Sequence, residues 1–169
     1  MSDKNIEYSV EGIDKFKSLI EAINICLFCT NLKTHDGATT RPMSVTHVCD
    51  QGNIWFFNAK NSEKNKEIEQ NPTVQLFFAH PAKGSYMVVN GDAIITTDPN
   101  KIEELWTPAA AIWFEKGKDD PNISLIKVTP SSAYFWDTDG NRMINLLKMA
   151  ASFVTGTNLV SGTEGDIKI

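Results

Sequence analysis

Arg41 is one of only two arginines in this chain of 169 residues, and it lies in the segment Thr40-Arg41-Pro42-Met43-Ser44, which reads as a β-strand. A guanidinium group on a strand can direct two parallel hydrogen bonds to a phosphate or a carboxylate. A charged residue beside a proline can equally protect an edge strand from aggregation. The segment therefore indicates either an anion-binding arginine or a protective charge at a sheet edge.

Ser62 and Lys64 form a second candidate anion site, at the start of an expected helix. Exposed backbone N–H groups, a hydroxyl and an ammonium group converge on such a helix start and attract anions. A lysine in the first turn opposes the helix dipole unless a negative ligand lies nearby. Glu63 weakens this argument, and an ordinary N-cap with solvated charges is the alternative.

Large aromatic residues lie close to these polar positions in the sequence. The run Trp55-Phe56-Phe57 leads into the Ser62 helix start, and Trp106 and Trp113 flank a proline. Such residues usually belong to a hydrophobic core. Two tryptophans this close together can instead cover a flat ring ligand or a subunit interface.

The cysteines and histidines form no recognisable metal or catalytic pattern. The segment Cys26-Leu27-Phe28-Cys29 has the spacing of half a zinc or redox site, but only Cys49 and scattered histidines remain to complete it. We therefore expect buried, reduced cysteines and no bound metal. The histidines are expected to be ordinary surface or partly buried residues.

The composition favours a globular protein and argues against two classes of partner. Hydrophobic residues make up 41% of the chain, and the net charge is -5. An acidic chain lacks the general basic surface that holds a nucleic-acid backbone, so we expect no nucleic-acid partner. No apolar run is long enough to span a membrane and no signal-peptide core is evident, so we expect a cytoplasmic protein without membrane association.

The expected elements mix helices and strands without a regular alternation. Apolar residues at helical spacing predict an amphipathic helix over residues 10–23. Further helices are expected over residues 62–70, closed by Asn71-Pro72, from Asp98-Pro99 onward, and over residues 142–154. The predicted strands are residues 25–32, 39–49, 54–57, 73–79, 86–97 and 124–136, with a bulge or bend at Gly91.

About six strands in meander order, with helices inserted between them, predict a mainly β protein built on a small antiparallel barrel. We expect residues 1–155 to form a single domain and residues 156–169 to be a poorly ordered polar tail. A Rossmann site is not expected, because no G-x-G-x-x-G motif follows a predicted strand.

The order of several short motifs resembles the pyridoxamine 5′-phosphate oxidase-like flavoproteins, in particular their general stress protein 26 branch. The motifs are Thr40-Arg41-Pro42-Met43, Phe56-Phe57-Asn58, Ser62-x-Lys64 and Asn71-Pro72-x-Val74. Later matching segments are Leu105-Trp106-Thr107-Pro108, Trp113-Phe114, Lys116-Gly117-x-Asp119-Asp120-Pro121 and Ala133-Tyr134-Phe135-Trp136-Asp137. The resemblance covers residues 10–140 and implies a split β-barrel homodimer, with FMN, or alternatively FAD, bound at the subunit interface.

The same resemblance implies a set of cofactor-binding residues. Arg41, Ser62 and Lys64 would hold the FMN phosphate. The other implied contacts lie around the isoalloxazine ring or lead up to the phosphate-binding serine; they are Pro42, Met43, Ser44, Phe57, Asn58, Tyr86 (from the neighbouring subunit) and Trp106. Trp113 is expected near the subunit interface, and no catalytic residue is assigned.

The chain departs from the vitamin-producing oxidases of this family at three points. Glu63 replaces a second basic residue, Thr46 replaces a lysine, and the Arg-x-His signature near the carboxyl terminus is absent. The resemblance therefore implies an FMN-dependent oxidoreductase for an unidentified small molecule rather than a pyridoxamine phosphate oxidase. A non-catalytic flavin-binding or flavin-buffering stress protein and a barrel used only for interaction or dimerisation are the alternatives.

Overall fold

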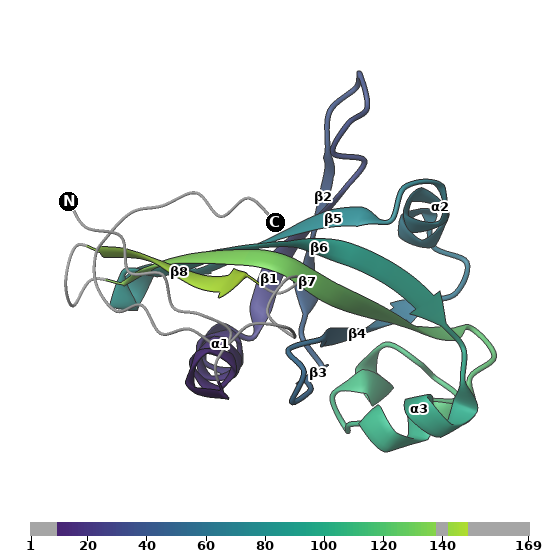
Figure 1. The fold of residues 1–169 in the computed structure, drawn as a ribbon. Helices are drawn as coiled ribbons and strands as arrows, with labels where there is room; N and C mark the ends of the chain where they lie inside the picture. Colours follow the sequence, from purple (N-terminus) through teal and green to yellow (C-terminus); the bar gives the residue numbers. More distant parts are fainter. Residues whose placement is uncertain (1–9, 138–141, 149–169) are drawn as a thin grey trace.

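A computed structural model of the protein describes residues 10–137 and 142–148, which form one curled antiparallel sheet with helices around it (Figure 1). The helices are α1 (Val10–Ile23), α2 (Glu63–Gln70) and α3 (Pro99–Leu105), with 3-10 turns η1 (Pro81–Lys83), η2 (Ala110–Ile112) and η3 (Gly117–Asp119). The strands are β1 (Ile25–Thr30), β2 (Thr39–Ser44), β3 (His47–Val48), β4 (Ile54–Ala59), β5 (Thr73–His80), β6 (Ser85–Thr96), β7 (Ile123–Asp137) and β8 (Arg142–Lys148).

The strands follow the order β2-β1-β5-β6-β7-β4-β3, and β8 pairs with β7. All these pairings are antiparallel. The prediction of a mainly β, antiparallel barrel is therefore confirmed. The expected meander order is wrong at β4, because β4 pairs with β7 and not with β5, which is the next strand in the chain.

The sheet has more strands than predicted, for two reasons. The expected strand over residues 39–49 divides into β2, which pairs with β1, and β3, which pairs with β4. The expected helix over residues 142–154 is wrong for residues 142–148, which form β8 along residues 132–137 of β7. β4 does not extend along this part of β7, so the backbone N–H and C=O groups on that edge are free to pair with residues 142–148. These strand hydrogen bonds outweigh the local helix propensity. Residues 149–154 and the predicted tail lie outside the described residues.

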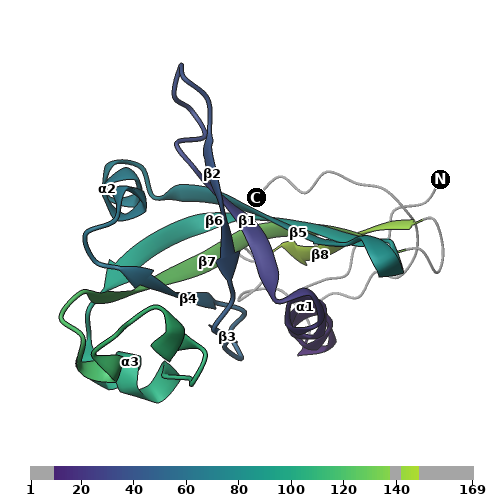
Figure 2. The same ribbon diagram turned by 180° about the vertical axis from the view of Figure 1, so that it is seen from behind.

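The main hydrophobic core lies inside the curl of the sheet. Phe28 and Phe56 meet edge to face at its centre, with ring centroids 5.3 Å apart. Phe16 and Ile20 of α1 are fully buried in the same core, as predicted for an amphipathic helix. Figure 2 shows α1 below the sheet and α2 at the other end of the strands.

A second, smaller cluster forms on the opposite face of β4. Side chains alternate between the two faces of a strand, so Phe56 enters the main core while its neighbours Trp55 and Phe57 face α3. Trp55 packs there with Ile102 and Leu105 of α3 and with residues of the following turns. This cluster fixes the position of α3 and of the loop that follows it.

Local signals were accurate for α2, α3 and the bend in β6. Ser62 and Asp98 cap α2 and α3 with their side chains, and α2 ends before Asn71-Pro72. The register of β6 against β7 shifts between Asn90 and Gly91, which confirms the predicted bulge. A side chain at Gly91 would collide with the backbone of β7 near Thr129, so this position requires glycine.

Candidate functional site

The start of α2 lies over the inner face of β1 and β2, and this contact brings the predicted anion-binding residues into one region. The Ser62 hydroxyl caps the helix by accepting a hydrogen bond from the Asn65 backbone N–H at 3.3 Å. Arg41 and Met43 alternate with exposed residues along β2 and turn inward, toward α2. Ser62, Arg41 and Lys64 are thus positioned by one helix start and one edge strand.

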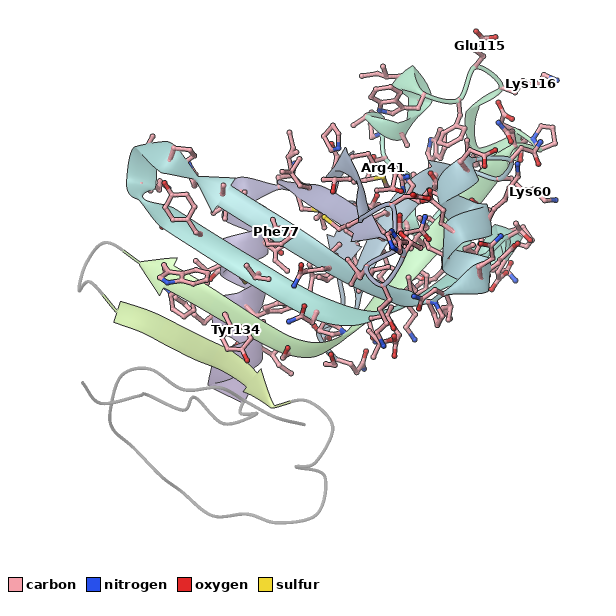
Figure 3. The ribbon with its side chains drawn as sticks, turned by 90° about the horizontal axis from the view of Figure 1, so that it is seen from above. Arg41, Lys60, Phe77, Glu115, Lys116 and Tyr134 are labelled. Atoms are coloured by element: carbon pink, nitrogen blue, oxygen red, sulfur yellow. The ribbon has the colours of Figure 1, made fainter. Side chains whose placement is uncertain are left out.

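Arg41 donates hydrogen bonds to two partners of its own chain. Its Nη1 donates to the Thr30 hydroxyl at 3.0 Å, and its Nη2 donates to Glu67 Oε2 at 2.8 Å. β2 is an edge strand, as the aggregation argument supposed, but the guanidinium turns inward and is partly buried. Arg41 (labelled in Figure 3) therefore faces α2 from β2 and is already paired with the carboxylate of Glu67.

Glu67 is a charged residue of this region that the sequence analysis did not predict. The Thr30 hydroxyl also donates to Glu67 Oε2, at 2.6 Å. Burial by itself would raise the pKa of Glu67, but the hydrogen bonds from Thr30 and Arg41 outweigh burial and lower it. The available signal was the i, i+3 spacing of Lys64 and Glu67 on α2, which places both on the same helix face.

Lys64 is buried although it carries an ammonium group. Only 7% of the residue is exposed, and its Nζ contacts the Met43 sulfur and lies 5.9 Å from the ring centre of Phe28. Burial, with the nearby charge of Arg41, lowers the pKa of Lys64 to about 8. No carboxylate among the described residues forms an ion pair with it.

Asn58 and Ser62 belong to a polar network that holds the start of α2 in place. Asn58 Nδ2 donates to Ser62 Oγ at 2.8 Å and to Asn65 Oδ1 at 2.5 Å. Asn65 Nδ2 in turn donates to Ser124 Oγ of β7 at 3.1 Å. The network fixes the orientation of the Ser62 hydroxyl, and Asn65 and Ser124 were not anticipated from the sequence.

The predicted ring-contacting residues of β2 divide between its two faces. Met43 points inward toward Lys64, while Pro42 and Ser44 are exposed on the outer face. One edge of β2 pairs with β1, and no described strand pairs with its other edge. Backbone N–H and C=O groups on such an edge are available to a planar ligand.

Phe57 and Trp106 lie together, on the face of β4 that packs against α3. Their ring centroids are 5.6 Å apart in an edge-to-face arrangement, and both pack against the second core cluster. Because successive residues of β4 face opposite ways, Phe57 points away from Asn58 and its network. The structure therefore places Phe57 and Trp106 in one aromatic group on the α3 side of β4.

Tyr86 lies at the far end of the sheet from α2. It pairs with Ala79 and Trp136 near the start of β6, and it is 43% exposed. The strand that follows α2, β5, begins at Thr73, which pairs with Asp92 at the other end of β6. Tyr86 and the predicted anion-binding residues of one chain are therefore not brought together.

A row of apolar side chains crosses the outer face of the sheet, and we call it the apolar band. It consists of Leu27, Phe77, Val88 and Tyr134, which are directly opposite one another on β1, β5, β6 and β7. Leu27 is 48% exposed and Phe77 39% exposed. Figure 3 shows Phe77 and Tyr134 on the face of the sheet turned toward the viewer.

The remaining candidates are structural or lie elsewhere. Cys26 and Cys29 are buried free thiols, as predicted, and burial raises the pKa of Cys26 to about 12.

Two surface hollows, of about 710 Å³ between α1 and η1 and about 400 Å³ beside α3, include none of the predicted site residues. No helix among residues 10–137 has the length and hydrophobicity that crossing a membrane requires. Trp113, on the turn after η2, is 78% exposed.

Comparison with known proteins gives matches in sequence and in structure. General stress protein 26 of Bacillus subtilis (strain 168) is 31% identical over 89 residues, which are 51% of this chain and 63% of that protein. The chain thus covers less than two thirds of this relative's length.

Solved structures with the same fold come from several bacteria. The general stress FMN/FAD binding protein of Xanthomonas citri superposes with a TM-score of 0.66 at 26% identity, covering 91% of this chain and all of that one (100%). General stress protein 26 of Bacillus anthracis str. Sterne superposes with a TM-score of 0.65 at 23% identity, covering 79% of this chain and 98% of that one. The family model "Pyridoxamine 5'-phosphate oxidase like" matches residues 11–159. With its motifs, its antiparallel barrel and this match in agreement, the chain belongs to the pyridoxamine 5′-phosphate oxidase-like family.

Proposed function

We propose that the protein binds FMN, with FAD as the alternative, and that Arg41, Ser62 and Lys64 hold the phosphate. The observation that carries this proposal is the buried ammonium of Lys64, in the first turn of α2 and beside Arg41. Burying a cation without a counter-ion costs several kcal/mol. A phosphate at the helix start would neutralise the charge of Lys64 and accept hydrogen bonds from backbone N–H groups of α2 and from the guanidinium of Arg41.

The exposed edge of β2 supports the placement of the ring. Pro42 and Ser44 are exposed on one face of β2, and Met43 points to the other face, where it contacts Lys64. The Xanthomonas citri protein that superposes on this chain is described as an FMN/FAD binding protein. We place the isoalloxazine along the edge of β2, in contact with Pro42, Met43 and Ser44.

We further propose that the protein is a homodimer whose subunits meet through the apolar band. Contiguous exposed apolar side chains commonly mark interaction surfaces. Leu27, Phe77, Val88 and Tyr134 cross four adjacent strands in register, and Pro42 extends the same row onto β2. An interface centred on this band would bring a partner subunit next to the ring position, which fits a ring contact from Tyr86 of that subunit.

When bound, the flavin would supply hydride or electron transfer, and the chain would supply orientation, charge and exclusion of water. We propose an oxidoreductase that acts on a small molecule in the cytoplasm. A non-catalytic flavin-binding protein is the second candidate, favoured by Glu63 and Thr46, where the vitamin-producing oxidases carry basic residues.

The experiment is a titration of the purified protein with FMN, followed in the visible spectrum and by flavin fluorescence. Saturable binding at micromolar concentration supports the proposal, and no bound flavin at any of these concentrations overturns it. Rapid mixing with NADH or NADPH, beside photoreduction with a deazaflavin, then separates the two candidates. Flavin that is photoreduced but that neither nicotinamide donor reduces would favour the non-catalytic protein.

A further inference from the structure

Glu67 forms an ion pair with Arg41, the arginine that the proposed phosphate site needs. Its Oε2 atom accepts hydrogen bonds from Arg41 Nη2 at 2.8 Å and from the Thr30 hydroxyl at 2.6 Å. The side chains of Arg41 and Glu67 are 23% and 17% exposed, so water screens this pair only partly. The carboxylate therefore already provides Arg41 with the kind of partner that a phosphate would provide.

Three charged groups share this region, and their balance matters for a dianionic ligand. Lys64 and Glu67 lie one turn apart on α2, and Arg41 faces both from β2. Two cations and one carboxylate leave a single net positive charge. A phosphate monoester carries a charge of about -1.5 to -2 at neutral pH. Any phosphate that reaches Arg41 therefore also meets the negative charge of Glu67.

We propose that Glu67 is an internal competitor for Arg41 that weakens the binding of phosphate-bearing flavins relative to uncharged ones. This inference rests on the proposed flavin-binding function and adds a specificity determinant to it. With Glu67 ionised, Arg41 divides its hydrogen bonds between a carboxylate and the phosphate, and the two anions repel. Without that charge, the full guanidinium is available to the phosphate. The carboxylate thus favours reversible binding of the phosphorylated flavin.

A competing role for Glu67 is to hold Arg41 in the orientation that binds phosphate. The two roles predict opposite results when the charge is removed. Glu67→Gln keeps the length of the side chain and an oxygen that accepts from Thr30. Glu69→Gln is the matched control, because Glu69 is an exposed residue of the same helix and loses the same charge.

The test compares FMN with riboflavin, which lacks the phosphate, by quenching of flavin fluorescence. We expect Glu67→Gln to bind FMN about tenfold more tightly than the unmodified protein, because a like charge is removed from beside the phosphate. Riboflavin affinity should stay unchanged, and Glu69→Gln should change FMN affinity by less than about twofold. In an Arg41→Ala background the gain from Glu67→Gln should disappear, as a double-mutant cycle would show.

Weaker FMN binding by Glu67→Gln, or an unchanged ratio of FMN to riboflavin affinity, would overturn the inference. If Glu67→Gln fails to fold, Glu67→Ala carries the same expectation. If the unmodified protein binds no flavin, the proposed function fails separately, and inorganic phosphate becomes the probe. A larger rise of the melting temperature with phosphate in Glu67→Gln than in the unmodified protein would then support the inference, and equal rises would overturn it.

Discussion

The ammonium group of Lys64 lies against the sulfur of Met43, where α2 meets the inner face of β2. A thioether sulfur is only a weak acceptor, so it does not replace the hydration that the ammonium loses on burial. Burial accordingly lowers the pKa of Lys64 to about 8. The chain thus keeps a cation where an apolar side chain would cost less to bury, which is typical of a binding residue.

Replacing Lys64 with methionine should stabilise the ligand-free protein. Lys64→Met keeps an unbranched side chain in the core and removes the buried charge, so the free energy of unfolding should rise by about 1 to 3 kcal/mol. Urea denaturation at pH 7 measures this change. Lys66→Met serves as control, because Lys66 is an exposed residue of the same helix. A loss of stability in Lys64→Met would mean that the ammonium has a favourable partner.

The stability of the ligand-free protein should depend on pH in the direction that Lys64 sets. Its pKa is about 8 in the folded chain, below the ordinary value of 10.5. Between these values the unfolded chain binds more protons, so the contribution of Lys64 to stability rises with pH from about 8 to 10.5 and is lost as pH falls through about 8. Lys64→Met should lack this rise. An identical pH profile in both proteins would contradict the assignment.

The affinity for FMN relative to riboflavin should fall as the pH rises above about 8. Only the protonated ammonium of Lys64 attracts a phosphate, and its pKa in the free protein is about 8. Fluorescence titrations of both flavins between pH 6.5 and 9.5 measure this ratio, and riboflavin corrects for any titration of the ring. A ratio that does not change over this range would show that Lys64 does not contact the phosphate.

Removing either proposed cation should weaken FMN binding without affecting riboflavin. Arg41→Ala and Lys64→Ala should each cost roughly 1.5 to 3 kcal/mol of FMN binding free energy, the range for hydrogen bonds to charged groups. Lys66→Ala, with its exposed side chain on α2, is the control. If both variants bind FMN as tightly as the unmodified protein, the phosphate is held elsewhere.

Much of this region was predictable from local sequence signals. Ser62 as a helix cap, the end of α2 at Asn71-Pro72 and the bend at Gly91 depend on residues close together in the chain. The Arg41–Glu67 pair was not predictable in the same way, because the two residues are 26 positions apart and the strands β3 and β4 lie between them. Pairing of that kind follows from the position of α2 on the sheet.

Two differences between the sequence-based expectations and the structure have identifiable physical origins. Residues 142–148 were predicted as a helix from their local propensity alone. That propensity takes no account of the unpaired edge of β7, with which these residues pair as β8. Phe57 and Asn58 were grouped as neighbours in sequence, but they face opposite sides of β4. The alternation of side chains along a strand contained this information.

The Asn58 network should be important for stability. Asn58→Ala removes the donor to Ser62 and leaves Asn65 Oδ1 buried without its partner, which should cost about 1 to 3 kcal/mol. The measurement is chemical denaturation, with Asn61→Ala as the control at an exposed position nearby. A change no larger than that of the control would show that the network contributes little.

The apolar band should mediate self-association. Phe77→Lys places a charge at its centre and should convert a dimer into monomers, which sedimentation velocity would detect. Ile94→Lys provides a control, because Ile94 is also exposed but lies six residues farther along β6 than Val88. A dimer that survives Phe77→Lys, or an unmodified protein that is monomeric with full FMN occupancy, would contradict the proposed interface.

The most direct test of the phosphate assignment is a crystal structure of the protein grown with FMN. We expect phosphate oxygens within hydrogen-bonding distance of the Arg41 guanidinium, the Ser62 hydroxyl and the Lys64 ammonium, at the start of α2. An FMN phosphate bound at another place, with these three groups in contact only with protein or solvent, would contradict it.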